Sequence, residues 1–168
     1  MKEKIKVLDV IDLILSIFDE TIFCYNYVVE TVKDPEIKGL FKEILEREKE
    51  HRDIFSSLKA RVCEDKAIED ELCGPPGMEE FFKFIIDENI FVNRKNKDEV
   101  LKGIKNPLDA LKLAKEHKKN AILLYQELAN YIHDMEARLM IEKVIEEEKR
   151  DLAKIYETIT KLSTTKQK

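Results

Sequence analysis

Tryptophan is absent from this sequence, and glycine and proline occur only four times each in 168 residues. Lys, Glu, Ile and Leu dominate instead, a composition that is typical of long helices. With 43% apolar residues, the chain is long enough for one domain with a sizeable core and too short for two ordinary domains. We therefore expect a single all-α domain over residues 1–168.

The three cysteines, Cys24, Cys63 and Cys73, contain no C-x-x-C pair. This spacing excludes a zinc ribbon and a rubredoxin-type iron site built from cysteines. Cys63 and Cys73 could form a disulfide across a short loop. We favour two unpaired thiols in a reducing cytosol, because the compartment decides cysteine pairing more than the spacing does.

Neither a surplus of positive charge nor a long apolar run is present. The 35 acidic and 30 basic residues predict a surface of mixed sign, which argues against a nucleic-acid partner. The apolar runs span only a few residues, as in Leu13-Ile14-Leu15, and no signal-type block follows Met1. We expect a soluble, cytoplasmic protein without a membrane partner.

Helical periodicity marks four long stretches. Asp34-Pro35 and Asn106-Pro107 each combine an N-cap residue with proline at the first helical position. Apolar residues recur on one stripe in every stretch. The predicted helices cover residues 8–32, 35–59, 107–131 and 135–162, with a polar tail at 163–168.

A long connection, residues 60–106, separates the two predicted hairpins. It contains two candidate short helices, near Met78–Asp87 and Lys97–Gly103. We therefore interpret it as a crossover connection within a helical bundle. Its apolar residues could cover an outer groove of the bundle or a dimer surface, and the sequence leaves both open; they are Phe81, Phe82, Phe84, Ile85 and Phe91.

Four charged residues interrupt the apolar stripes at one height. At ~1.5 Å of rise per helical residue, Glu20 and Glu48 each lie roughly 18 to 20 Å from the first turn. Lys118 and Glu148 lie about 13 residues on either side of the second turn, at the same height. Isolated buried charges would cost several kcal/mol each, so we expect these residues to pair or to bind metal.

His51 follows Glu48 by three residues, in an E-x-x-H arrangement. This spacing turns a carboxylate oxygen and an imidazole nitrogen toward one shared ion. The corresponding residue of the last helix is Asp151, three residues after Glu148.

These features resemble the rubrerythrin-like, ferritin-like di-iron carboxylate family. The resemblance covers both hairpins and implies a ferritin-like four-helix bundle of two antiparallel hairpins. It rests on Glu20 seven residues before Tyr27, on Asp34-Pro-Glu-Ile-Lys38, on Glu48-Lys-Glu-His51, on Asp109-Ala-Leu-Lys-Leu-Ala114, on Tyr125 and on Glu148.

In that family, two helices each give a Glu and the other two each give a Glu-x-x-His pair, which together hold two irons. By this resemblance, Lys118 stands where the second terminal Glu would be, and Asp151 where the second His would be. We expect at most one ion, Fe, Mn or Zn. The resemblance assigns its ligands to Glu20, Glu48, His51, Glu148 and Asp151.

A lysine at position 118 changes the electrostatics of such a site. Its ammonium can neutralise the carboxylates that a second metal would hold, and it repels a metal beside it. Without metal, Lys118 would join the same four carboxylates in an ion-paired network. His117 could turn inward as a substitute ligand, but we favour a boundary or solvent-facing position for it.

Two functions follow as alternatives. The first is a metal-binding protein related to peroxide, oxygen or iron, an oxidoreductase of rubrerythrin type that needs a separate electron donor because it lacks the rubredoxin cysteines. The second is a metal-free bundle with an internal salt-bridge network, acting as a structural or interaction protein. The resemblance also implies a homodimer.

Overall fold

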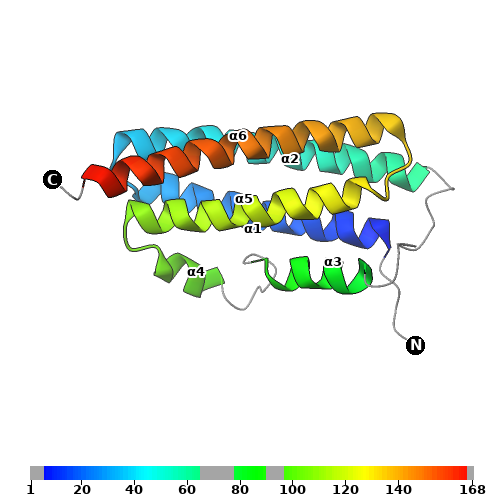
Figure 1. Cartoon of the computed structure of the whole chain (residues 1–168), viewed down its shortest axis with the longest axis horizontal. Helices are drawn as coiled ribbons and strands as arrows, with labels where there is room; N and C mark the ends of the chain where they lie inside the picture. Colours follow the sequence, from blue (N-terminus) through cyan, green and yellow to red (C-terminus); the bar gives the residue numbers. More distant parts are fainter. Residues whose placement is uncertain (1–5, 65–77, 90–96, 166–168) are drawn as a thin grey trace.

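The computed structural model describes residues 6–64, 78–89 and 97–165. These residues form six helices and no strand: α1 (Val7–Thr31), α2 (Pro35–Glu64), α3 (Met78–Asp87), α4 (Lys97–Gly103), α5 (Pro107–Ala129) and α6 (Met135–Thr165). Helices α1 and α2 form one antiparallel hairpin, and α5 and α6 form the other (Figure 1). The predicted all-α bundle of two hairpins, with two short helices between them, is confirmed.

Two helices run further than the sequence predicts. Helix α2 continues to Glu64 instead of ending near Lys59, and its extension buries Val62. Helix α6 continues to Thr165, into the segment predicted to be a frayed tail. In both cases there is no proline or glycine to stop the helix, so its hydrogen-bonded ladder continues.

The helix starts carry the caps that the sequence indicates. In α2 the Asp34 carboxylate accepts a hydrogen bond from the Ile37 amide at 3.0 Å, and in α5 Asn106 accepts one from Asp109 at the same distance. Asp134 caps α6 by accepting from the Ala137 amide at 2.6 Å. Each cap satisfies an amide that has no partner inside the helix.

The core lies between the four long helices. Its largest fully buried side chains include Phe18, Tyr25, Phe41, Phe55 and Tyr125. The rings of Phe55 and Tyr125 lie 4.9 Å apart, and those of Phe18 and Phe55 lie 5.5 Å apart. This aromatic packing joins α1 and α2 to α5 at mid-height of the bundle.

Helix α3 covers an outer side of the bundle next to α5 (Figure 1). Two of its own residues, Phe82 and Ile85, are buried against the bundle, and the Phe82 ring lies 5.6 Å from the ring of Tyr131. Phe81 and Phe84 remain 41% and 57% exposed. Of the two alternatives left open by the sequence, Phe82 and Ile85 therefore cover the outside of the bundle.

Further expectations concern the cysteines, Phe91 and membrane-spanning helices. Cys63 is exposed in α2, whereas Cys73 and Phe91 lie outside the described residues, so the pairing of Cys63 stays a prediction. In the described part of the chain, no helix has the length and apolar character needed to span a membrane.

We predict that Asp134→Ala lowers the free energy of unfolding by about 1–2 kcal/mol, because it removes the α6 cap. It also removes the contact of Asp134 with Arg61 of α2, at 3.3 Å. Urea unfolding followed by circular dichroism measures the change. Asp53→Ala, at an exposed position within α2, is the matched control; equal losses in both variants would contradict the role of the cap.

Candidate metal centre

A lysine occupies the middle of the bundle. The Lys118 side chain is completely buried, and its Nζ donates a hydrogen bond to Glu48 of α2. Nζ also lies 2.9 Å from Glu148 Oε2 and 3.4 Å from Asp151 Oδ2, both on α6. One ammonium group thus contacts three buried carboxylates from two helices.

Two further cationic side chains flank this centre. His51 Nδ1 lies 2.9 Å from Glu148 Oε1, and its Nε2 lies 2.8 Å from Glu147 Oε2. On the opposite side, Arg47 Nε donates to Asp151 Oδ2 at 3.0 Å. The charged cluster, defined here as Arg47, Glu48, His51, Lys118, Glu147, Glu148 and Asp151, therefore alternates acidic and basic groups.

Burial and the neighbouring charges shift the pKa values of the cluster. Burial raises the pKa of Glu48 to about 7, despite the opposing charge of Lys118. Burial also disfavours the ionised form of Glu148, but Lys118 and His51 outweigh it and lower the pKa of Glu148 to about 2. The carboxylates likewise outweigh the burial of Lys118, so its pKa is raised and it stays an ammonium.

His51 is held toward its charged form. Burial alone would lower its pKa, but the hydrogen bond and charge of Glu148, with Glu48 and Glu147, raise it above the ordinary value. Because both ring nitrogens face carboxylate oxygens, the imidazolium can donate to each of them.

The predicted site residues are largely brought together. Glu48, His51, Lys118, Glu148 and Asp151 all lie in the charged cluster with 0% exposure. The match in height derived from the helical rise therefore holds for these residues. Their role as metal ligands stays a prediction.

Glu20 does not occupy the inward position that we expected. It is partly exposed, whereas Ile17, Phe18 and Thr21 are the buried residues of this turn of α1. The residue 100 positions later, Asn120, is also partly exposed, and its side chain donates to the Glu88 carbonyl at the end of α3. Position 20 thus lies on the side of α1, not at the bundle centre.

An internal repeat with a spacing of 100 residues explains this error. Glu48 and Glu148 are equivalent, as are Tyr25 and Tyr125, and buried positions of α1 and α2 recur at this spacing in α5 and α6. By the same spacing, the counterpart of Lys118 is Phe18. The printed sequence contains this signal, because Asp34 and Asp134, and Glu46 and Glu146, also repeat without any gap.

The contacts agree with that equivalence. The Phe18 ring lies 6.5 Å from the ring of His51, just as Lys118 contacts Asp151, the residue equivalent to His51. At this spacing Glu20 corresponds to Asn120, two residues away from Lys118, so the shared height of Glu20 and Lys118 does not make them equivalent. Counting the helical rise fixes the height of a side chain but not the direction in which it points.

His117 is buried, which the sequence interpretation did not expect. It is 1% exposed, and its Nε2 lies 3.3 Å from the Thr21 hydroxyl of α1. Burial, together with the neighbouring charge of Lys118, lowers its pKa to about 3, so the ring is neutral. The apolar stripe of α5 is wide enough to take in two successive residues at this level, His117 and Lys118.

This arrangement does not fit a pair of metal ions. The ammonium of Lys118 contacts the carboxylates that would bridge the metals, and both nitrogens of His51 face Glu147 and Glu148. The two repeat positions that could add terminal carboxylates carry Phe18 and Lys118. Within the described ranges, no group of three or more His, Cys, Asp or Glu residues is arranged to hold a metal ion.

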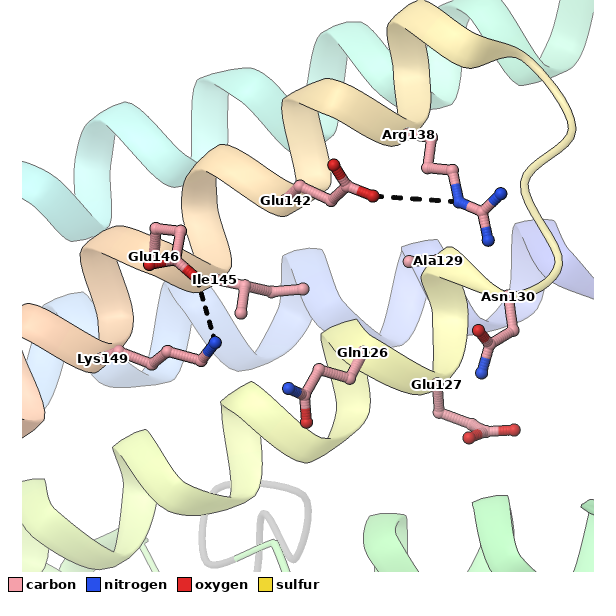
Figure 2. A pocket seen from close by; sticks show the side chains of 9 residues that line it. All are labelled: Gln126, Glu127, Ala129, Asn130, Arg138, Glu142, Ile145, Glu146 and Lys149. Atoms are coloured by element: carbon pink, nitrogen blue, oxygen red, sulfur yellow. Dashed lines mark hydrogen bonds and ion pairs between the residues drawn. The ribbon is translucent and has the colours of Figure 1, made fainter.

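A surface pocket of about 480 Å³ lies apart from the charged cluster, between the end of α5 and the first half of α6 (Figure 2). Four of its charged side chains pair with each other: Arg138 Nε lies 4.0 Å from Glu142 Oε1, and Lys149 Nζ lies 2.9 Å from Glu146 Oε1. The fifth charged residue of the lining is Glu127, so the pocket carries one negative charge in excess.

We predict that Lys118→Met lowers the free energy of unfolding by about 3–5 kcal/mol, because it leaves buried carboxylates without their cation. Adding Glu48→Gln should recover part of this loss, since it removes one of the stranded charges. Urea unfolding measures both effects. Lys119→Met, one residue away and exposed, should change stability by less than about 0.5 kcal/mol; a similar loss in both lysine variants would contradict the prediction.

The raised pKa of Glu48 predicts a pH-dependent stability. Its folded value of about 7 lies above the ordinary 4.5, so folding takes up a proton at this carboxyl group. The stability that Glu48 contributes relative to Glu48→Gln should therefore fall as pH rises from about 4.5 to 7. Unfolding of both proteins across this range measures the difference, and a difference independent of pH would contradict the shift.

Comparisons with known proteins agree with the fold. No family model matches the chain, and no curated protein matches it. A solved structure from Thermotoga maritima, named as a candidate ferritin-like diiron-carboxylate protein, superposes with a TM-score of 0.74 at 23% identity. The match covers 95% of this chain and 98% of the other. The chain therefore has the ferritin-like fold.

Proposed function

We propose that this chain is a metal-independent ferritin-like bundle that serves as a structural or interaction protein. The observation that supports this most directly is the position of the Lys118 ammonium among Glu48, Glu148 and Asp151. A divalent ion bound by these carboxylates would lie within a few ångströms of a fixed positive charge, which disfavours binding.

The cluster supplies its own positive charge. Arg47, Lys118 and protonated His51 balance most of the charge of Glu48, Glu147, Glu148 and Asp151. Buried ions are tolerated when each has partners with good geometry, and such networks can fix one packing register. In this proposal the site holds the two hairpins together and performs no redox chemistry, because none of its side chains cycles between oxidation states in the way iron does.

A second candidate is a protein with one Fe, Mn or Zn ion. It is favoured by the convergence of Glu48, His51 and Glu148, which provide oxygen and nitrogen ligands within one buried centre. This ion would require Lys118 to move aside. The oxidoreductase activity and the electron donor belong to this candidate only.

Metal analysis of the purified protein separates the two candidates. We predict far less than one ion per chain after expression in iron-supplemented cells, and no gain after anaerobic addition of Fe(II), because the ammonium of Lys118 already neutralises the carboxylates. Elemental analysis measures the content. One tightly held ion per chain would overturn the proposal and support the second candidate.

The internal repeat provides a matched gain-of-binding variant. Phe18→Glu, Lys118→Glu and Asp151→His together complete the Glu and Glu-x-x-His set at the repeat positions. This triple variant should bind Fe(II) under conditions in which the original chain does not. Adding Glu20→Gln to the triple variant should leave Fe(II) binding unchanged. Loss of binding would instead indicate that Glu20 is a metal ligand.

A further inference from the structure

Glu48 differs from the other carboxylates in its partners. Glu148 contacts His51 at 2.9 Å, and Asp151 receives a hydrogen bond from Arg47 at 3.0 Å. Among the described residues, Glu48 forms an ion pair with Lys118 and with no second cation. The charges of Glu48 and Lys118 could therefore both be removed while each remaining carboxylate keeps a cation.

The pair lies in a water-excluded, largely aromatic environment. Both side chains are 0% exposed, and the nearby core contains the rings of Phe18, Phe55 and Tyr125, which pack against one another. Tyr25 is fully buried near both groups, and its hydroxyl has no hydrogen-bond partner in the described part of the chain. Such surroundings penalise an ion pair relative to a neutral group of similar shape.

An amine and a carboxyl group held in contact react as if at very high concentration. Effective molarities of well-oriented intramolecular reactions reach about 10⁵–10⁸ M. An amide between them would replace two buried formal charges with one neutral dipole and would release water to the solvent. Both the geometry and the desolvation cost of the ion pair therefore favour condensation.

We propose that Lys118 and Glu48 condense to an isopeptide bond between Lys118 Nζ and Glu48 Cδ. The inference rests on the proposed function, because a metal ion on Glu48 would occupy the reacting carboxyl group. No oxidant, reductant or cofactor takes part.

The reaction balances within the charged cluster. Nζ donates a hydrogen bond directly to Glu48, and one proton passes along it from the ammonium to that carboxyl group, whose affinity for a proton is raised by burial. The freed amine attacks Glu48 Cδ and forms the C–N bond. A second proton then moves from nitrogen to a Glu48 oxygen, the C–O bond breaks, and that oxygen leaves as water. One cation and one anion disappear, and Glu148 ends ionised beside His51.

The product would be a covalent link between the two hairpins. Glu48 lies in α2 and Lys118 in α5, so the bond closes a loop that contains α3, α4 and the crossover. A cross-link that closes a long loop stabilises a fold chiefly by restricting its unfolded chain.

Mass spectrometry of the full-length chain under denaturing conditions tests the bond directly. We expect the intact mass to be lower than the sequence mass by one water molecule, either on purification or after prolonged warming of the folded protein. After trypsin digestion, tandem spectra should show a branched peptide that joins Glu48 to Lys118, with no cleavage after Lys118.

Three variants serve as controls. Lys118→Arg keeps the positive charge but removes the amine, and it should show the full mass. Glu148→Gln leaves the reacting pair in place and removes one of the charges that keep Nζ protonated, so it should not slow the loss of water. Lys119→Arg changes an exposed neighbour and should still lose water. Circular dichroism identifies any variant that has not folded.

A folded native chain that keeps its full mass after warming would overturn the proposal. A cross-link that maps to Glu148 or Asp151 instead of Glu48 would overturn it as well. These results are independent of the metal analysis, because a metal-free chain with full mass leaves the proposed function intact. A chain that retains iron contradicts the proposed function whatever its mass.

Discussion

The ion pairs of Lys118 are the constraint on which the centre of this bundle depends. Taking an ammonium and three carboxylates out of water costs several kcal/mol per ion, and only their mutual contacts offset that cost. The contacts require α2, α5 and α6 to meet at one height and in one rotation. Apolar packing alone would tolerate small shifts of a helix along its neighbour, whereas the cluster does not.

The internal repeat shows how the two hairpins share this constraint. Each hairpin contributes a central glutamate, Glu48 or Glu148, and each pairs its residue 51 or 151 with position 147 or 47 of the other hairpin. The polarity is reversed between the two halves: His51 meets Glu147, and Asp151 meets Arg47. The backbone repeat is therefore nearly symmetric while its charges are complementary, which favours contact between unlike hairpins over contact between like ones.

Sequence patterns predicted the helices well because caps and apolar stripes are local signals. Asp34 and Asn106 cap the helices they precede, and the rise per residue correctly placed Lys118 level with Glu48 and Glu148. The predictions that Glu20 points inward and that His117 is solvent-facing were wrong. Both properties depend on the rotation of each helix against its neighbours and on the width of its buried stripe. The 100-residue repeat indicates the direction of these side chains, because equivalent positions of the two hairpins face the same way, inward or outward.

A buried group of carboxylates can be stabilised in two chemically different ways. A bound metal ion supplies two or more charges but must be acquired from solution, so the folded state depends on metal supply and on pH. A lysine brings its one charge with the chain, without uptake from solution, and adds hydrogen-bond donors, but its charge cannot cycle as iron does. With only one charge at the centre, the remaining carboxylates need other cations, and Arg47 and His51 occupy those positions. The single charge of Lys118 therefore accounts for the cationic residues that surround the centre.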